Sequence, residues 1–100
     1  MPCEERRAVR IPVDWDAAVA SPAGDESRCC VLDISNRGCR IRTETTSSVG
    51  TCVNVLLPQF ASVTGWVAWR ADCEAGIDFA HPMPLAVFEE ILRRNGRRDL

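Results

Sequence analysis

The chain has 100 residues, 46% of them hydrophobic and 26% charged, which is the size and composition of one soluble globular domain. Its net charge of −2 provides no overall positive field that would gather nucleic acid. No apolar run approaches the length needed to cross a membrane, and residues 1–10 are too charged for a signal peptide. We therefore expect a single cytoplasmic domain over residues 1–100, with no membrane segment.

A period of two in the apolar residues dominates residues 11–80 and predicts β-strands. In the first of them Ile11, Val13 and Trp15 alternate with residues that suit a solvent-facing side. Six short strands joined by short turns favour an antiparallel barrel or closed sandwich over a parallel sheet. The predicted strands cover residues 11–16, 28–34, 39–44, 53–57, 63–69 and 75–79, preceded by a flexible, arginine-bearing segment over residues 1–10.

The period changes after residue 83, where one helix is predicted over residues 84–95. Pro84 suits the first helical position, and Asn95-Gly96 suits the end. The apolar stripe expected to pack on the barrel consists of Leu85, Phe88, Ile91 and Leu92. We expect the arginines of this helix to face solvent; a partner-binding or membrane-surface helix is the alternative. The fold class is therefore mostly β: a six-stranded antiparallel β-barrel with one C-terminal α-helix.

The six cysteines do not predict a metal site. They form no Cys-x-x-Cys pair, and His81 is the only histidine, so a zinc site would need scattered thiolates. Most of them lie within apolar strand patterns, where cysteine acts as a small buried hydrophobic residue in a reducing compartment. We expect neither a metal nor a cofactor.

The scarcest motif in the chain is Asp-x-Ser-x-x-Gly, formed by Asp33, Ser35 and Gly38 between two predicted strands. In many proteins such a segment is only a turn, in which Asp and Ser bond to nearby backbone and Gly accepts an unusual conformation. A carboxylate at a strand end also suits the paired N–H donors of a guanine, and a glycine lets a planar ligand approach. Both interpretations stay open on the residues alone.

A basic run precedes the first strand and contains Arg6, Arg7 and Arg10. A guanidinium can bind a phosphate bidentately, bond to the O6 and N7 acceptors of guanine, or stack on a base. The spacing of four between Arg6 and Arg10 recurs twice near the C-terminus, so it identifies nothing alone. The alternative is a solvated basic tail that balances neighbouring glutamates.

With both motifs in place, the chain resembles the PilZ domain family, whose members bind the bacterial second messenger cyclic di-GMP. Arg6 and Arg10 match the family's Arg-x-x-x-Arg, and the motif at Asp33 matches its Asp/Asn-x-Ser-x-x-Gly. Residues 65–69 and 76–79 are similar to the family's fifth-strand Gly-x-Val-x-Trp and closing Gly-Ile-x-Phe. The resemblance implies a six-stranded antiparallel barrel with a C-terminal helix, the same layout that the periodicity predicts.

The resemblance also implies roles for individual residues. Arg6 and Arg10 would clasp the phosphates and guanine edges, while Asp33, Ser35 and Gly38 would hold a guanine at the barrel surface. Trp69 would stack on a base, although a tryptophan in an alternating strand is equally expected in the core. Additional charge near the ligand would come from Arg7, Arg37 and Arg40.

We therefore expect a receptor that binds cyclic di-GMP and relays the signal to an unidentified downstream protein. The second hypothesis is a ligand-independent protein-interaction adaptor of the same fold, in which the motif is only a turn. A third, a barrel for single-stranded nucleic acid, is disfavoured by the net charge and the absence of lysine and tyrosine. One histidine without a nucleophile and base pair gives no catalytic residues, so no enzyme is expected. The sequence leaves open whether the domain works alone or as a homodimer.

Overall fold

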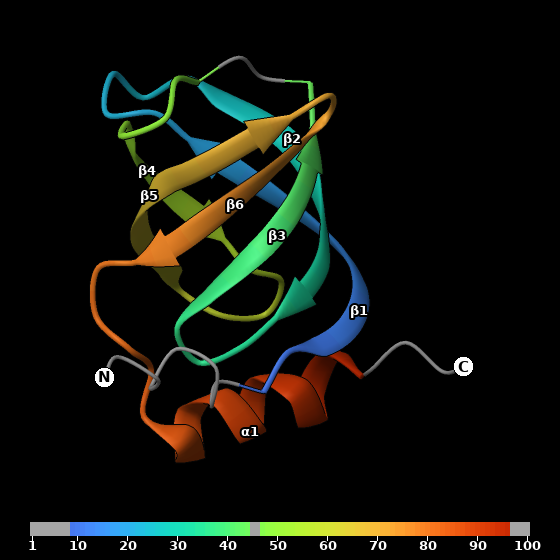
Figure 1. The fold of residues 1–100 in the computed structure, drawn as a ribbon. Helices are drawn as coiled ribbons and strands as arrows, with labels where there is room; N and C mark the ends of the chain where they lie inside the picture. The colour runs from blue at the N-terminus through green and yellow to red at the C-terminus, as the bar shows by residue number, and fades with distance from the viewer. Residues whose placement is uncertain (1–8, 45–46, 97–100) are drawn as a thin grey trace, which may run out of the picture.

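The computed structural model describes residues 9–44 and 47–96 and shows a closed β-barrel with one helix across its end (Figure 1). The predicted six-stranded antiparallel barrel with a C-terminal helix is confirmed. The elements in chain order are β1 (Ile11–Ala20), β2 (Glu26–Ile34), β3 (Gly38–Thr43), β4 (Cys52–Leu56), β5 (Ser62–Ala71), β6 (Glu74–Phe79) and α1 (Leu85–Asn95).

Around the barrel the strands follow the order β1-β2-β3-β6-β5-β4, and every neighbouring pair is antiparallel. Pairing of β1 with β4 closes the barrel, which removes the unpaired edges that an open sheet would expose. The strands β2, β3, β6 and β5 therefore lie side by side, although β6 follows β3 only after two further strands of the chain.

The core fills the barrel interior with one alternate set of side chains from each strand, as the period of two predicts. The fully buried members are mostly branched aliphatic residues, which pack well on a pleated surface. The largest of them are Ile34, Ile41, Ile77, Ile91, Val13, Val31, Val55 and Cys39.

Three register shifts interrupt the strand pairing, between Pro12 and Trp15, between Val31 and Asp33, and between Val67 and Trp69. A β-bulge adds a residue to one strand and so turns the following side chain towards the other face. The second shift pairs Asp33 with Arg40 on the outer surface while Ile34 returns to the core.

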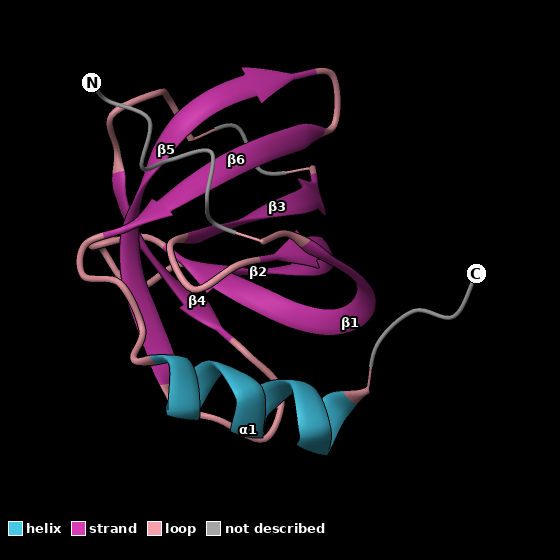
Figure 2. Cartoon of the chain, turned by 60° about the horizontal axis from the view of Figure 1, so that its bottom comes forward, coloured by secondary structure: helices cyan, strands magenta, loops and turns pink. Residues whose placement is uncertain are grey.

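The helix α1 lies across one end of the barrel, which Figure 2 brings forward. Phe88, Ile91 and Leu92 are buried against the strands. Leu85 was predicted in the same stripe, but that prediction was wrong: the residue is 64% exposed. It is the first residue of the helix, a full turn before the first buried position, Phe88.

The ends of α1 are set by backbone geometry. Pro84 is the N-cap residue with φ −56° and ψ 143°, one position before the helical position predicted for it. The helix ends as predicted at Gly96, whose φ of 80° suits glycine and whose N–H donates to the Leu92 carbonyl. The indole Nε1 of Trp15 donates to the Gly96 carbonyl at 2.9 Å, which fixes this end of the helix to β1.

The described cysteines contradict the expectation that most cysteines of the chain are buried. Cys29 and Cys39 are buried, but Cys30 is half-buried, and Cys52 and Cys73 are exposed. Burial alone therefore does not account for most of them. Within the described ranges no cluster of three His, Cys, Asp or Glu residues could hold a metal ion, and none of the helices in those ranges has the length and apolarity to span a bilayer.

Candidate functional site

The two sequence motifs meet at the start of β1. Antiparallel pairing places Pro12 opposite Asp33 and Ile11 opposite Ile34, so the residue just before β1 lies beside the end of β2. There Arg10 Nη1 donates to Asp33 Oδ1 at 2.5 Å, across 23 positions of sequence. Arg6 and Arg7 lie outside the described residues. The fold thus brings together one arginine of the basic run and the carboxylate of the second motif.

The other oxygen of the Asp33 carboxylate is bound by Arg40, from the neighbouring strand β3. Arg40 Nε donates to Asp33 Oδ2 at 2.8 Å, and Arg40 Nη1 donates to Glu74 Oε1 on β6 at 2.9 Å. The hydrogen bond that Arg40 donates to Asp33 is the main cause that raises the pKa of Arg40, and the bond that it donates to Glu74 adds to this effect. The result is a continuous chain of charges, Arg10, Asp33, Arg40 and Glu74, on the outside of the barrel.

Ser35 and Gly38 lie in the turn between β2 and β3. The backbone N–H of Ser35 donates to the Gly38 carbonyl at 2.8 Å, and the Arg37 N–H donates to Ser35 Oγ at 3.1 Å. Ser35 is 3% exposed, so its hydroxyl is held within the turn. At Gly38 an added Cβ would lie 2.4 Å from the Ile77 carbonyl oxygen, which makes glycine necessary for the close approach of β3 to β6.

The same turn is tied to the segment that leads into α1. The Asn36 carbonyl accepts from the Met83 N–H at 2.8 Å, and Asn36 Nδ2 donates to the Met83 carbonyl at 3.3 Å. The Arg37 carbonyl accepts from the Phe79 N–H at 2.9 Å, while the Arg37 residue itself is exposed. Two of these bonds join the turn to Met83, just before the helix, and the third joins it to the end of β6.

Trp69 is on the outer surface, 39% exposed, so the alternative that placed it in the core is wrong. The register shift after Val67 pairs Trp69 with Gly76 and turns the indole outwards. An added Cβ at Gly76 would lie 2.0 Å from Trp69 Nε1 and 2.5 Å from its Cε2. The indole thus lies directly over the glycine backbone, in a position that a larger residue would prevent.

Successive strand pairings align four of these residues across the barrel. Asp33 on β2 pairs with Arg40 on β3, Arg40 pairs with Gly76 on β6, and Gly76 pairs with Trp69 on β5. Three inter-strand steps correspond to about 14 Å along the surface. We call this alignment the outer row. Together with Arg10, which bonds to Asp33, it places a carboxylate, two guanidinium groups and an aromatic ring on one face. Such groups bind phosphates and purine bases.

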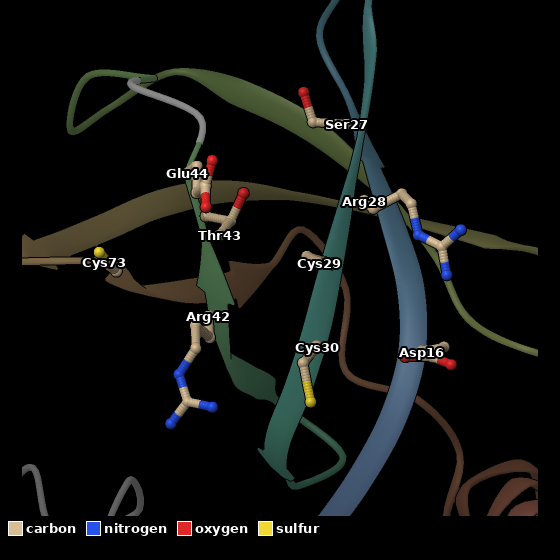
Figure 3. A pocket seen from close by; sticks show the side chains of 9 residues that line it. All are labelled: Asp16, Ser27, Arg28, Cys29, Cys30, Arg42, Thr43, Glu44 and Cys73. Carbon is tan, nitrogen blue, oxygen red and sulfur yellow. The ribbon is translucent and has the colours of Figure 1, made fainter.

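A separate hollow of about 660 Å³ is lined mainly by residues of β1, β2 and β3 (Figure 3). Its lining includes Arg28, Arg42 and Cys30, but also the carboxylates of Asp16 and Glu44. Among the described residues of the two motifs, none lines it. The described lining of this hollow contains no aromatic side chain, so it lacks the stacking surface that Trp69 gives the outer row.

Two groups on this face were not predicted from the sequence. Glu74 enters the site only through the pairing of β3 with β6, which no local pattern reveals. Trp66, 45% exposed, lies on β5 near Trp69 and faces outwards because its neighbours Gly65 and Val67 face the core. The alternation of inward-facing and outward-facing residues in β5 could have predicted the outward position of Trp66.

The structure is thus a closed six-stranded barrel with a charged, partly aromatic outer row. The sequence model of the PilZ domain matches residues 4–95, and the chain belongs to this family. PilZ domains form a family of cyclic di-GMP receptors, which bind rather than catalyse. No curated protein matches the chain.

Proposed function

We propose that this chain binds cyclic di-GMP on the outer row and passes the binding event to a partner protein. The observation that carries the proposal is the meeting of Arg10 with Asp33, which unites two motifs of the family on one surface. A receptor for a second messenger made inside bacterial cells would act in the cytoplasm. No cofactor is needed for this function.

In the proposed complex the Asp33 carboxylate accepts from the N1–H and N2–H donors of a guanine. Arg10 leaves Asp33 and, together with Arg6, binds the phosphates and the O6 and N7 acceptors of the base. Trp69 offers its exposed ring face for stacking. Ser35 and Gly38 contribute by keeping the turn, and hence Asp33, in place.

Transfer of Arg10 from the Asp33 carboxylate to a phosphate of the ligand is favourable, because the ligand brings two negative charges. The Arg10 side chain is 53% exposed, so its contact with Asp33 is the weakly stabilising kind found at surfaces. The ligand therefore replaces a weak internal ion pair with several charge-assisted bonds, and part of that gain offsets the ordering of the arginine segment.

For the relay, we propose that the turn containing Asn36 acts on the residues that precede α1. Its two bonds to Met83 support this route. Beside α1 a hollow of about 360 Å³ is lined by Phe60, Val87 and Ile91, together with the charged residues Glu90 and Arg94. A hollow that combines apolar and charged lining suits a protein partner.

The adaptor alternative has one observation in its favour. The Asp33 carboxylate is already bound by two arginines, so the charges of Asp33 and Arg10 are paired without any nucleotide. In that case the hollow beside α1 would bind its partner independently of cyclic di-GMP.

Calorimetric titration with cyclic di-GMP and with GTP tests the proposal. We expect saturable binding that is selective for cyclic di-GMP and is lost in an Arg6→Ala/Arg10→Ala variant. Loss of one charged bidentate contact costs about 2 kcal/mol, or about 30-fold in affinity. The control variant Arg93→Ala/Arg97→Ala removes two arginines at the same spacing and should bind normally. Absence of binding by the wild type would favour the adaptor.

A further inference from the structure

We propose that Arg40 is a positioning residue for guanine recognition: supported by Glu74, it holds the Asp33 carboxylate in the orientation that reads the base. The inference rests on the proposed function and adds a residue that the Asp-x-Ser-x-x-Gly motif does not contain. Arg40 would act through Asp33, without contacting the nucleotide.

The contacts of Arg40 differ from those of an arginine that merely adds charge. Its Nε binds Asp33 Oδ2 at 2.8 Å and its Nη1 binds Glu74 Oε1 at 2.9 Å. The guanidinium is planar and rigid, so two carboxylates on two different strands fix its plane. That plane in turn fixes one edge of the Asp33 carboxylate, whose side chain is only 15% exposed.

The two arginines on Asp33 are not equivalent. Arg10 precedes the first strand, is 53% exposed, and makes one ion pair within the described part of the chain. Arg40 lies within β3, with paired strands on both sides, is 39% exposed, and makes two ion pairs. A ligand that needs Asp33 would therefore displace Arg10 and leave Arg40 bound.

With Arg40 bound and Arg10 displaced, the Asp33 carboxylate is still able to bind guanine. Each carboxylate oxygen has two acceptor sites, so Oδ2 can accept from Arg40 and from one guanine N–H together. Departure of Arg10 opens Oδ1 for the second guanine N–H. Without Arg40 the Asp33 side chain could rotate about its own bonds. The two N–H donors of guanine would then meet the carboxylate in many orientations, and this would weaken recognition of the base.

Arg42 provides a matched control on the same strand. It lies two residues further along β3, pairs with Cys30 on one side and Glu74 on the other, and is exposed at the margin of the hollow in Figure 3. Within the described ranges it makes no ion pair with a carboxylate. Substitution of Arg42 therefore removes the same charge from the same face without touching Asp33.

The test compares Arg40→Met and Arg42→Met in their affinity for cyclic di-GMP and for cyclic di-IMP, whose base lacks the N2 amino group. The readout is the ratio of the two affinities, because only base recognition changes it. We expect the wild type to prefer cyclic di-GMP, and Arg40→Met to reduce that preference about tenfold. Arg42→Met should weaken both ligands equally and leave the ratio unchanged.

A second variant tests the same role if Arg40→Met folds poorly. Glu74→Gln keeps the Arg40 contact with Asp33 but removes the charge that supports Arg40, and we expect a smaller fall in the same ratio. Equal ratios in Arg40→Met, Arg42→Met and the wild type would overturn the positioning role while leaving the receptor function intact. A wild type that binds cyclic di-GMP without distinguishing cyclic di-IMP would overturn it too. Failure of the wild type to bind either nucleotide would instead reject the proposed function.

Discussion

The two halves of the Asp-x-Ser-x-x-Gly motif differ in what surrounds them. Asp33 lies on the outer surface with both carboxylate oxygens bound by arginines. Ser35 and Gly38 are buried, one bonded within the turn and the other pressed against the backbone of β6. The comparison teaches that a single motif combines a recognition group with the residues that hold it in place. Substitutions in the two halves should therefore separate affinity from stability.

The largest effect is expected for Gly38→Ala. The added Cβ would lie 2.4 Å from the Ile77 carbonyl oxygen, and since both atoms belong to paired strands, neither can move easily. We expect a loss of about 3 kcal/mol in the free energy of unfolding, measured by denaturant titration. Gly24→Ala is the control, because its added Cβ meets no atom within 4 Å although φ is +97°. Its cost should be about 1 kcal/mol, and equal costs at the two positions would contradict the packing argument.

Asp33→Ala should show the opposite pattern. Affinity for cyclic di-GMP should fall about 30-fold, because the base loses a charged acceptor. The free energy of unfolding should change by no more than about 1 kcal/mol, since the ion pairs of Asp33 involve exposed arginines. Calorimetry and denaturant titration on the same preparation measure both quantities. A variant that binds normally but unfolds easily would assign Asp33 to the structural half of the motif.

Ser35→Ala is expected to have a moderate effect, and mainly on stability. Its hydroxyl accepts the Arg37 N–H inside a buried turn, and loss of such a bond costs about 1 kcal/mol. Ser62→Ala, at an exposed strand position, serves as the control and should change stability by less than about 0.5 kcal/mol. If Ser35→Ala left stability unchanged and abolished nucleotide binding, the hydroxyl would belong with Asp33 in the recognition half.

The smallest effect at neutral pH concerns the two buried thiols, Cys29 on β2 and Cys39 on β3. Burial raises the pKa of Cys29 from its ordinary value near 9 to about 11, and burial also raises that of Cys39. Between pH 9 and 11 the unfolded chain has released the Cys29 proton while the folded chain retains it. Stability should therefore be fully present below pH 9 and decline as the pH rises towards 11.

Replacement of the Cys29 thiol should make the loss of stability above pH 9 less steep. We expect Cys29→Ala to reduce the slope of the unfolding free energy against pH above pH 9, and Cys52→Ala, which removes an exposed thiol, to leave it unchanged. Denaturant titrations at a series of pH values measure the slope. Identical slopes in the two variants would show that burial of Cys29 does not control it.

Much of the fold was predictable because one face of each strand is buried. The alternation of side chains located six strands, and the change of period near Pro84 located the helix. The bulges were not predictable, since an extra residue breaks the alternation only at one point. For that reason the outward position of Trp69 was left open by the sequence. The exposure of Leu85 was missed because helical spacing alone does not show where the barrel ends.

The candidate site was predictable only as far as local motifs extend. Arg10 and Asp33 were identified by spacing and by family resemblance, and the pairing of β1 with β2 places them in contact. The contacts of Arg40 with Asp33 and Glu74 depend on the register of three strands. Such contacts join residues far apart in sequence, so no window along the chain contains them.

The most direct test of the central claim is an NMR titration of the ¹⁵N-labelled domain with cyclic di-GMP. We predict shifts in the backbone amides of residues 33–40 and in the indole N–H of Trp69, with the turn around Gly24 unchanged. Shifts confined to the hollow around Arg28 and Cys30, or none at saturating nucleotide, would contradict the assignment of the outer row as the binding surface.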